Sequence, residues 1–495
     1  MKRRDFLKYG AAGLSALCVG DCVPWIMRDE AEAQVRQPLV LNFRITDAIK
    51  EMATHNAINP ARCYFWIYKE ESLEPDCPGP HIFATTGSTI QITITNELDE
   101  VHNMVIPGPA NPRTGAPARR PVFDSGPIAP GATVTRRFRA PAPGTYMYHD
   151  SLNAPVNRVM GLHGAFISMP RPPRAVAANR VVRRVTPYQR PTPSVQRLFN
   201  HLGSPPAPNS RVGSVWFPGL SWEEGDSLTN TPPFRQYIWL LHQASPNLFA
   251  EVGDFTPGQN FPADQFVQRF LRDAFDPVKP TQNAIPQYFT INGQSGHFSH
   301  NSPYINPNHR VGEPALIRVL NAGLWTHSLH MHGNHFYVLA TNGLIQSNLL
   351  FVDTFNVEPM DLQDWLVPYH RPPDVPNTRG IGMPDPPLVT LTGGSTWPPN
   401  QELATFIPPV GTQTLGLIDI SVRLSPLAYP MHDHSEPSQT SQGGNYNMGM
   451  ISGFNITGDR TLPGGVVSFP HQPLVFPPGP ESGKFPPAVP PPWID

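Results

Sequence analysis

The sequence predicts an all-β fold built from tandem β-sandwich domains. Many short runs alternate between β-branched and polar residues and are separated by turn residues, which is the pattern of half-buried strands in sandwiches. Proline is abundant, with 63 residues in a chain of 495, and glycine adds 39. Together they stay below the roughly 25–30% that indicates low-complexity disorder. The composition therefore indicates ordered strands joined by long, stiff loops, with little helix.

A first sandwich is predicted over residues 36–170. Residues 81–98 read HIFATTGSTIQITITNEL, and isoleucines alternate with polar residues there. Residues 131–150 predict a strand, a Pro/Gly turn and a second strand, and residues 160–169 predict one more. The Pro/Arg-rich stretch over residues 171–210 is typical of a linker.

A second sandwich with insertions is predicted over residues 210–470. Its strands are expected within residues 234–243, 287–296, 315–323 and 327–343. Residues 262–275 are the best helix candidate, because Phe266, Phe270 and Leu271 recur at helical spacing and would cover a core. A Pro-rich tail follows over residues 471–495.

The overall composition is that of a soluble globular protein. The hydrophobic share is 39% and the formal net charge is −2. This balance does not indicate a nucleic acid or an anionic membrane surface as the partner.

The N-terminus predicts export. It reads MKRRDFLKYGAAGLSALCVG, with paired arginines before a mildly apolar run, and the small-residue stretch AEA follows at Ala31–Ala33. This pattern is typical of a twin-arginine signal peptide, here over residues 1–33, and it places the mature protein in the periplasm or outside the cell. The apolar run is too short to span a bilayer, so we expect no membrane span.

Two cysteines, Cys63 and Cys77, remain after removal of the signal peptide. In an oxidising compartment we expect a disulfide that closes this short loop and stabilises the fold by about 3 kcal/mol. The rest of the mature chain has no thiol.

Two groups of histidines follow strand spacing. The first lies in THSLHMHGNHF and the second in AYPMHDHSEPSQ. Residues two apart on a strand project from the same face, so His330 and His332 point one way together, as do His432 and His434. Neutral imidazoles suit copper, zinc and iron. A buried histidine can also be a satisfied core residue, but two parallel pairs favour a metal cluster.

At these residues the chain resembles the multicopper oxidases. HSLHMHGNHF is close to the family's third copper signature, H-P-x-H-x-H-G-x-x-F, and PMHDHSEPSQTSQGGNYNMGM is close to the fourth. NELDEVHNMVIPG lies where the first signature, H-x-H-G, belongs, and GTYMYHDS resembles the second. The resemblance extends from about residue 39 to about residue 458. It implies a cupredoxin-like Greek-key sandwich for each domain and copper as the cofactor.

The resemblance implies a role for individual residues. His102 and His330 fall on the type 2 copper ligands, whereas His149, His332, His432 and His434 fall on type 3 positions. Met104 and Ser151 replace the two remaining type 3 histidines, and Met104 could offer a thioether to Cu(I) or simply pack. Asp124 falls where the family has an acid that assists proton delivery, although an ordinary turn aspartate is an equal alternative.

Asp433 falls on the cysteine that binds type 1 copper in this family. Ser438 stands near the second type 1 histidine, so only His327 remains, with Met448 or Met450 as a possible axial residue. A blue-copper centre needs a thiolate, and this position has none. We predict instead that Asp433 hydrogen-bonds to His327, because either group unpaired in a buried pocket would cost about 1–3 kcal/mol or more. Two alternatives are a different metal on this pair and an outward-facing Asp433.

The spacing between the second and third signatures predicts two domains. Too few residues separate His149 from His327 for a complete extra sandwich, although a reduced middle domain is an alternative. In two-domain relatives the copper site forms between the first domain of one subunit and the second domain of its neighbour. The resemblance therefore implies a homotrimer.

These observations favour an exported copper oxidoreductase that lacks the blue site and works through a type 2/type 3-like cluster. A small-molecule reductant would bind at that cluster, with dioxygen as the candidate oxidant. One alternative is non-catalytic copper binding, for sequestration or as a scaffold on a decayed oxidase fold. Copper nitrite reductase ranks last, because it also needs a type 1 cysteine.

Overall fold

The computed structural model describes residues 38–52, 61–109, 118, 120–170, 186–202, 235–275, 288–302, 304–309, 314–369, 427–439, 449–456, 461–462 and 466–467. The predicted signal peptide, Met448, the tail and much of the predicted linker lie outside these residues. No helix in the described part is long and apolar enough to cross a membrane.

The first sandwich packs two sheets of orders β2-β1-β4-β7 and β3-β9-β8-β5-β6. Its strands are β1 (Leu39–Met52), β2 (Ala61–Glu70), β3 (Ile82–Thr85), β4 (Thr89–Asn96), β5 (Val105–Ile106), β6 (Phe123–Asp124), β7 (Thr133–Arg139), β8 (Gly144–His149) and β9 (His163–Met169). In β4 the buried residues Ile90, Ile92 and Ile94 alternate with half-buried polar ones, as the sequence predicts. The all-β fold class is confirmed.

The second sandwich packs sheets of orders β11-β10-β13-β18-β15-β16 and β12-β20-β19-β14-β17. Its strands are β10 (Arg235–Ala244), β11 (Tyr288–Ile291), β12 (Asn308–His309), β13 (Ala315–Asn321), β14 (His327–Met331), β15 (Phe336–Thr341), β16 (Leu344–Val352), β17 (Thr354–Val357), β18 (Leu362–Val367), β19 (Leu427–Asp433) and β20 (Ile451–Ile456). A small separate hairpin joins β21 (Thr461–Leu462) to β22 (Val466–Val467).

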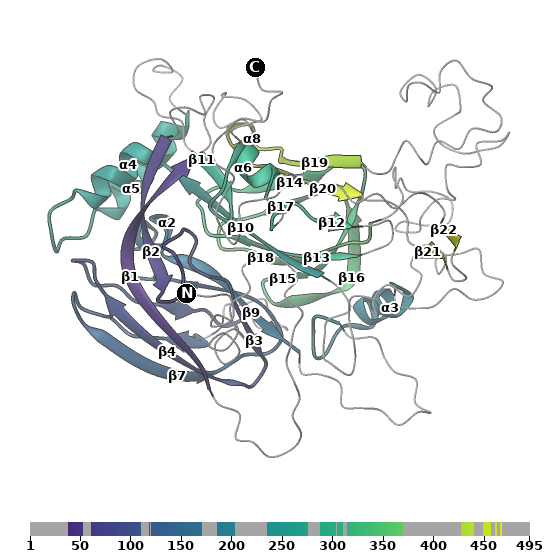
Figure 1. Ribbon diagram of the computed structural model, residues 1–495, viewed down its shortest axis with the longest axis horizontal. Helices are drawn as coiled ribbons and strands as arrows, with labels where there is room; N and C mark the ends of the chain where they lie inside the picture. Colours follow the sequence, from purple (N-terminus) through teal and green to yellow (C-terminus); the bar gives the residue numbers. More distant parts are fainter. Residues whose placement is uncertain are drawn as a thin grey trace, which may run out of the picture.

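The two sandwiches pack directly against each other (Figure 1). Met147 and Ile167 of the first sandwich and Leu240 and Leu320 of the second belong to one buried apolar cluster. This contact explains why β8 and β9 are buried at every position instead of alternating. Apolar residues on both faces of a strand are typical of a sheet that is covered on both sides.

A buried polar network also joins the sandwiches. The Thr145 hydroxyl donates to Asp364 over 2.5 Å, and the Tyr188 hydroxyl donates to the same carboxylate over 2.6 Å. Arg318 completes the network with an ion pair to Asp364 at 2.9 Å. Because Thr145 lies on β8 and Asp364 on β18, this network fixes the two sandwiches relative to each other.

The few helices cover the edges of the sandwiches. They are α2 (Val156–Val159), α3 (Pro193–Leu202), α4 (Pro246–Gly253), α5 (Ala263–Phe275), α6 (Gly296–His300) and α8 (Glu436–Gln439). Helix α5 confirms the predicted helix, and Phe266 and Phe270 bury its apolar stripe in the core of the first sandwich. Helix α3 lies within the segment predicted as linker, and its residues Val195 and Phe199 share a buried apolar cluster with Leu316 of the second sandwich.

The disulfide expected between Cys63 and Cys77 is not formed. Both cysteines are buried and both are free. Cys63 lies on β2, opposite Lys50 of β1, and its sulfur contacts the Tyr64 carbonyl at 3.7 Å. Cys77 belongs to the following loop, and its sulfur faces Gly161 and two imidazoles instead.

Candidate metal centre

Strands β14 and β19 bring four predicted ligands together. The two strands are antiparallel, with His330 directly opposite His432. The rings of His330 and His332 are 4.7 Å apart, and those of His432 and His434 are 4.9 Å apart. Leu329 and Met331, the neighbours of His330 on either side, are buried in the core. The predicted same-face arrangement of the histidines follows directly from this strand alternation.

Three of these histidines offer donor atoms at metal-site spacing. One nitrogen from each of His330, His332 and His432 lies within 4.8 Å of the other two. Nε2 of His332 and Nε2 of His432 face each other at 3.0 Å. His332 and His434 are exposed, His330 is half-buried and His432 is buried. The group is therefore open on one side of the second sandwich.

The surroundings keep these imidazoles in the form that binds metal. Burial, followed by repulsion from neighbouring imidazoles, lowers the pKa of His332 below its usual value. Burial also lowers the pKa of His330, although Asp353 acts in the opposite direction. Nδ1 of His330 hydrogen-bonds to the Thr354 hydroxyl at 2.8 Å. Such an outer partner fixes the ring orientation of a metal-binding histidine, and neutral imidazole suits copper.

Asp433 lies behind this group and pairs with His327, as predicted. The two side chains are fully buried, and Oδ2 of Asp433 is 2.5 Å from Nδ1 of His327. The carboxylate also accepts hydrogen bonds from the backbone amide of Ser328 at 2.7 Å and from the Ser438 hydroxyl. Nε2 of His327 contacts the Gln243 amide at 3.0 Å.

The pKa of Asp433 reflects this enclosure. Burial alone would raise it, but the charge and hydrogen bond of His327, together with the Ser438 hydroxyl, bring it below the usual aspartate value. The carboxylate is therefore an internal anion with a complete set of donors.

The predicted ligands of the first sandwich lie apart from this group. In the described part of the chain, His102 and His149 join no set of three ligand side chains whose donor atoms lie within 4.8 Å of one another. His102 is fully buried, with Nδ1 at 2.8 Å from Asp150. Burial would lower its pKa, but hydrogen bonds and charges of Asp150 and Glu100 raise it overall. His149 directs Nδ1 to the Asp150 carbonyl, and its Nε2 is buried without a partner.

Strand register relates the two sandwiches to each other. In the first sandwich Val105 lies opposite His149, and in the second His330 lies opposite His432. If His149 corresponds to His432, Val105 occupies the position of His330. On that correspondence the first signature would be shifted by three residues from the alignment made on sequence, and His102 would correspond to His327. Copper ligation by His102 stays a prediction, and its contacts favour a structural role.

The remaining predicted residues have ordinary contacts. Met104 is fully buried in the first core, which favours the packing alternative. Ser151 donates its backbone amide to Asn103 at 2.9 Å. Asp124 is exposed and accepts a hydrogen bond from the backbone amide of Gly126 at 2.8 Å, as a turn aspartate does. Met450 is buried in the second core.

The structure also brings together three residues that sequence reasoning did not connect. Cys77, His163 and His242 each place one donor atom within 4.8 Å of the other two, and all three are buried. The only local signal was a histidine inside an apolar run, in GLHGAFI and in YIWLLHQ.

Comparisons with known proteins agree with the fold and the histidine signatures. Two segments match family models described as multicopper oxidase, residues 72–172 and residues 273–369. An L-ascorbate oxidase from Brassica rapa subsp. pekinensis is 31% identical over 128 residues, which is 23% of this chain and 22% of the relative. A laccase from Ustilaginoidea virens is 31% identical over 96 residues, 19% of this chain and 14% of the relative. The matches thus span less than a quarter of these relatives.

Some solved structures are similar to this chain at lower identity. The multicopper oxidase mgLAC is 15% identical with a TM-score of 0.45, covering 84% of this chain and 86% of its own. A blue copper oxidase from Nitrosomonas europaea is 15% identical with a TM-score of 0.44, covering 84% and 85%. Residues 72–172 and 273–369 therefore match the multicopper oxidase family, which agrees with the resemblance of the histidine signatures.

Proposed function

We propose that the protein is an exported copper-dependent oxidoreductase in which His330, His332, His432 and His434 hold the copper. The observation that carries this proposal is the convergence of imidazole nitrogens within 4.8 Å on the open side of the second sandwich. The residues fit the metal, because burial lowers the pKa values of His330 and His332, and the Nδ1 atoms of His330 and His432 already have partners. Bound copper would supply one-electron redox chemistry.

The protein's own residues define what this site can do. Nδ1 of His432 faces the Asp433 carbonyl at 3.1 Å, which leaves Nε2 for a ligand. The exposed rings of His332 and His434 form the face that a small-molecule reductant would meet. Asp433 holds His327 in a complete hydrogen-bond set at the family's type 1 position. The reductant would therefore have to reach the histidine group directly.

The proposal includes a homotrimer and twin-arginine export. The exposure of His332 and His434 supports the homotrimer, because a neighbouring first sandwich could flank this side and leave an entrance for the reductant. Asp124, exposed on β6, is proposed as the proton-delivering acid on the resemblance alone. The two-domain division over residues 36–170 and 210–470 is likewise kept as a proposal, with the linker between them.

The experiment is copper counting with electron paramagnetic resonance on purified full-length protein. A His330→Ala/His432→Ala double variant should lose the copper held by this histidine group, together with its resonance signal. The neighbouring His335→Gln variant is the control, because His335 stacks on Phe351 outside the group. Equal copper contents in all three proteins would refute the assignment.

Copper sequestration without catalysis is the second candidate. It is favoured by the complete hydrogen-bond set around Asp433, where the family has an electron-transferring cysteine. Oxygen uptake by the copper-loaded protein with a phenolic or metal-ion reductant separates the two functions. Uptake that disappears in the double variant supports the oxidase, and its absence in fully loaded protein supports sequestration.

A further inference from the structure

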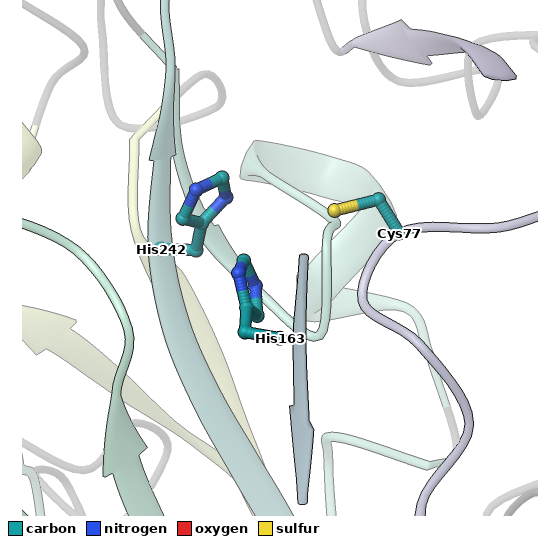
Figure 2. A group of neighbouring side chains, drawn as sticks. All are labelled: Cys77, His163 and His242. Carbon is teal, nitrogen blue, oxygen red and sulfur yellow. The ribbon is translucent and has the colours of Figure 1, made fainter. Parts of the chain in front are cut away.

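A second group of potential ligands lies between the two sandwiches, away from the four histidines. Cys77 comes from the loop after β2, His163 begins β9, and His242 lies on β10 of the second sandwich (Figure 2). All three are at most 1% exposed. The rings of His163 and His242 are 4.4 Å apart, and the cysteine sulfur points toward them.

Hydrogen bonds fix which imidazole nitrogen is free. Nδ1 of His163 faces the Arg158 carbonyl at 2.8 Å, so its proton is placed there. Nε2 of His242 faces the next carbonyl, that of Val159, at 2.7 Å. The opposite atoms, Nε2 of His163 and Nδ1 of His242, are buried and have no hydrogen-bond partner. Each ring thus presents an unused lone pair, and buried polar atoms without a partner are rare in folded proteins.

The backbone holds Cys77 in place beside these rings. The amide of Gly79 donates to the His163 carbonyl over 2.9 Å, which ties the cysteine loop to β9. Lys50 donates to the Cys77 carbonyl over 2.8 Å. The Cys77 sulfur lies close to Gly161, since a Cβ added there would be 3.2 Å from it. The loop is therefore positioned before any ligand arrives.

The donor spacing fits a small metal ion after a slight contraction. With metal–ligand bonds of ~2.0–2.3 Å, three donors around one ion lie roughly 3.5–4 Å apart. The three donor atoms now lie within 4.8 Å of one another, so each needs to move by less than about 1 Å to reach this spacing. We propose that Cys77, His163 and His242 bind one copper ion as Cu(I), at a position outside the copper signatures of the family.

Charge and ligand number favour Cu(I) over zinc. Thiolate ligands select soft ions such as Cu(I), whereas structural zinc sites have four ligands and this group offers three. Binding breaks the S–H bond of Cys77, forms the Cu–S bond and releases the proton to solvent, so a Cu(I) thiolate is neutral. Zinc would leave one positive charge beside Arg158, which is 7% exposed and whose described contacts are the carbonyls of Ala322 and Gly323. An extra buried cation there would be costly.

The pKa values of the two imidazoles agree with this geometry. Burial is the main cause that lowers the pKa of His242 to about 3 and that of His163 well below its usual value. Both rings are therefore neutral at physiological pH, which is the form that binds metal.

The site would join the two sandwiches and approach one predicted ligand. His242 belongs to the second sandwich, whereas Cys77 and His163 belong to the first. His163 is also the direct cross-strand partner of His149 on β8. A copper ion here would act as a crosslink within one chain.

The test is anaerobic Cu(I) titration of the full chain against the competing chelator bicinchoninate. The starting protein is the His330→Ala/His432→Ala double variant, which removes the proposed catalytic site. We expect it to retain one Cu(I) per chain with a sulfur neighbour in the X-ray absorption spectrum. Adding the Cys77→Ser substitution should abolish this Cu(I) binding. Adding Cys63→Ser instead, which removes the other buried thiol, should leave it unchanged.

The outcomes separate this site from the proposed function. A folded double variant that binds no Cu(I), or a Cys77→Ser variant that binds as much as its parent, would overturn the site. Binding of zinc but not Cu(I) would overturn it too. If the Cys77→Ser protein fails to fold by circular dichroism, His242→Gln gives the same readout. Failure of the proposed function appears differently, as equal copper binding by wild type and the double variant.

Discussion

Replacing Asp433 tests its buried hydrogen bond with His327 most directly. The Asp433→Ala substitution removes the acceptor of the His327 ring and of the Ser328 amide. Each donor left unpaired in a buried site costs about 1–3 kcal/mol. The Ser438 hydroxyl loses this acceptor as well, so the substitution removes hydrogen bonds from three donors. We therefore expect the free energy of unfolding to fall by about 3–5 kcal/mol, with copper binding at the exposed histidines largely kept.

The assay is urea unfolding of the copper-free protein, followed by fluorescence. Asp124→Ala is the control, because that exposed carboxylate accepts one described hydrogen bond, from Gly126. Its loss should cost about 0.5–1.5 kcal/mol. A change of less than about 1 kcal/mol for Asp433→Ala would refute the reasoning, since it would mean that the carboxylate is not needed to satisfy the buried donors.

The pH dependence has a defined sign. The folded-state pKa of Asp433 lies below the unfolded value, which is about 3.9 for an aspartate. The carboxylate therefore stabilises the fold fully above the unfolded pKa, and this contribution is lost as the pH falls through the folded pKa. The stability difference between wild type and Asp433→Ala should be constant near neutrality and should shrink below about pH 4. A difference that grows on acidification would contradict the stabilising role of the ionised carboxylate.

Three further predictions concern the joint between the sandwiches and the assembly. Asp364→Ala should lower the free energy of unfolding by about 3–5 kcal/mol in the same urea assay, because it leaves the buried Arg318 without its anionic partner. A change below about 1 kcal/mol would contradict this. Gly161→Ala should destabilise the protein and weaken Cu(I) binding at Cys77. The added Cβ would lie 2.4 Å from the Trp66 carbonyl, and the φ of Gly161 is +125°. Unchanged Cu(I) binding would count against the proposal that the backbone at Gly161 positions the Cys77 thiol. Light scattering of copper-loaded protein should give the mass of a trimer, and a monomer with its full copper content would exclude the shared site.

The strand pattern was readable from the sequence because it is local. The alternation in β4 follows from side-chain period alone, and so does the shared face of His330 and His332. Burial of β8 at every position depends on the second sandwich, which the sequence of β8 does not encode. Helix α3 was missed for a similar reason, because its proline-rich surroundings resemble a linker and its stability comes from packing against the second sandwich.

The cysteine prediction failed because it considered only the two thiols. Counting Cys63 and Cys77 in an exported chain favours a disulfide. The fold instead directs the Cys77 sulfur toward His163 and His242, which come from distant parts of the chain. Such contacts between distant residues depend on how the two sandwiches pack together, so they cannot be predicted from the periodicity of one strand.

The His–Asp pair recurs in both sandwiches, and this recurrence explains the shifted first signature. Asp150 accepts hydrogen bonds from the His102 ring and from the backbone amide of Asn103. In the same way, Asp433 accepts hydrogen bonds from the His327 ring and from the backbone amide of Ser328. Each aspartate also directly follows a histidine whose Nδ1 faces the aspartate's own carbonyl. Both sandwiches therefore use one local design, in which a buried carboxylate fixes an imidazole behind the exposed strand face. The second sandwich keeps histidines on that face, whereas the first has Val105 there. The copper ligands of this chain are consequently expected to be unequal between the two sandwiches, with the second supplying most of them.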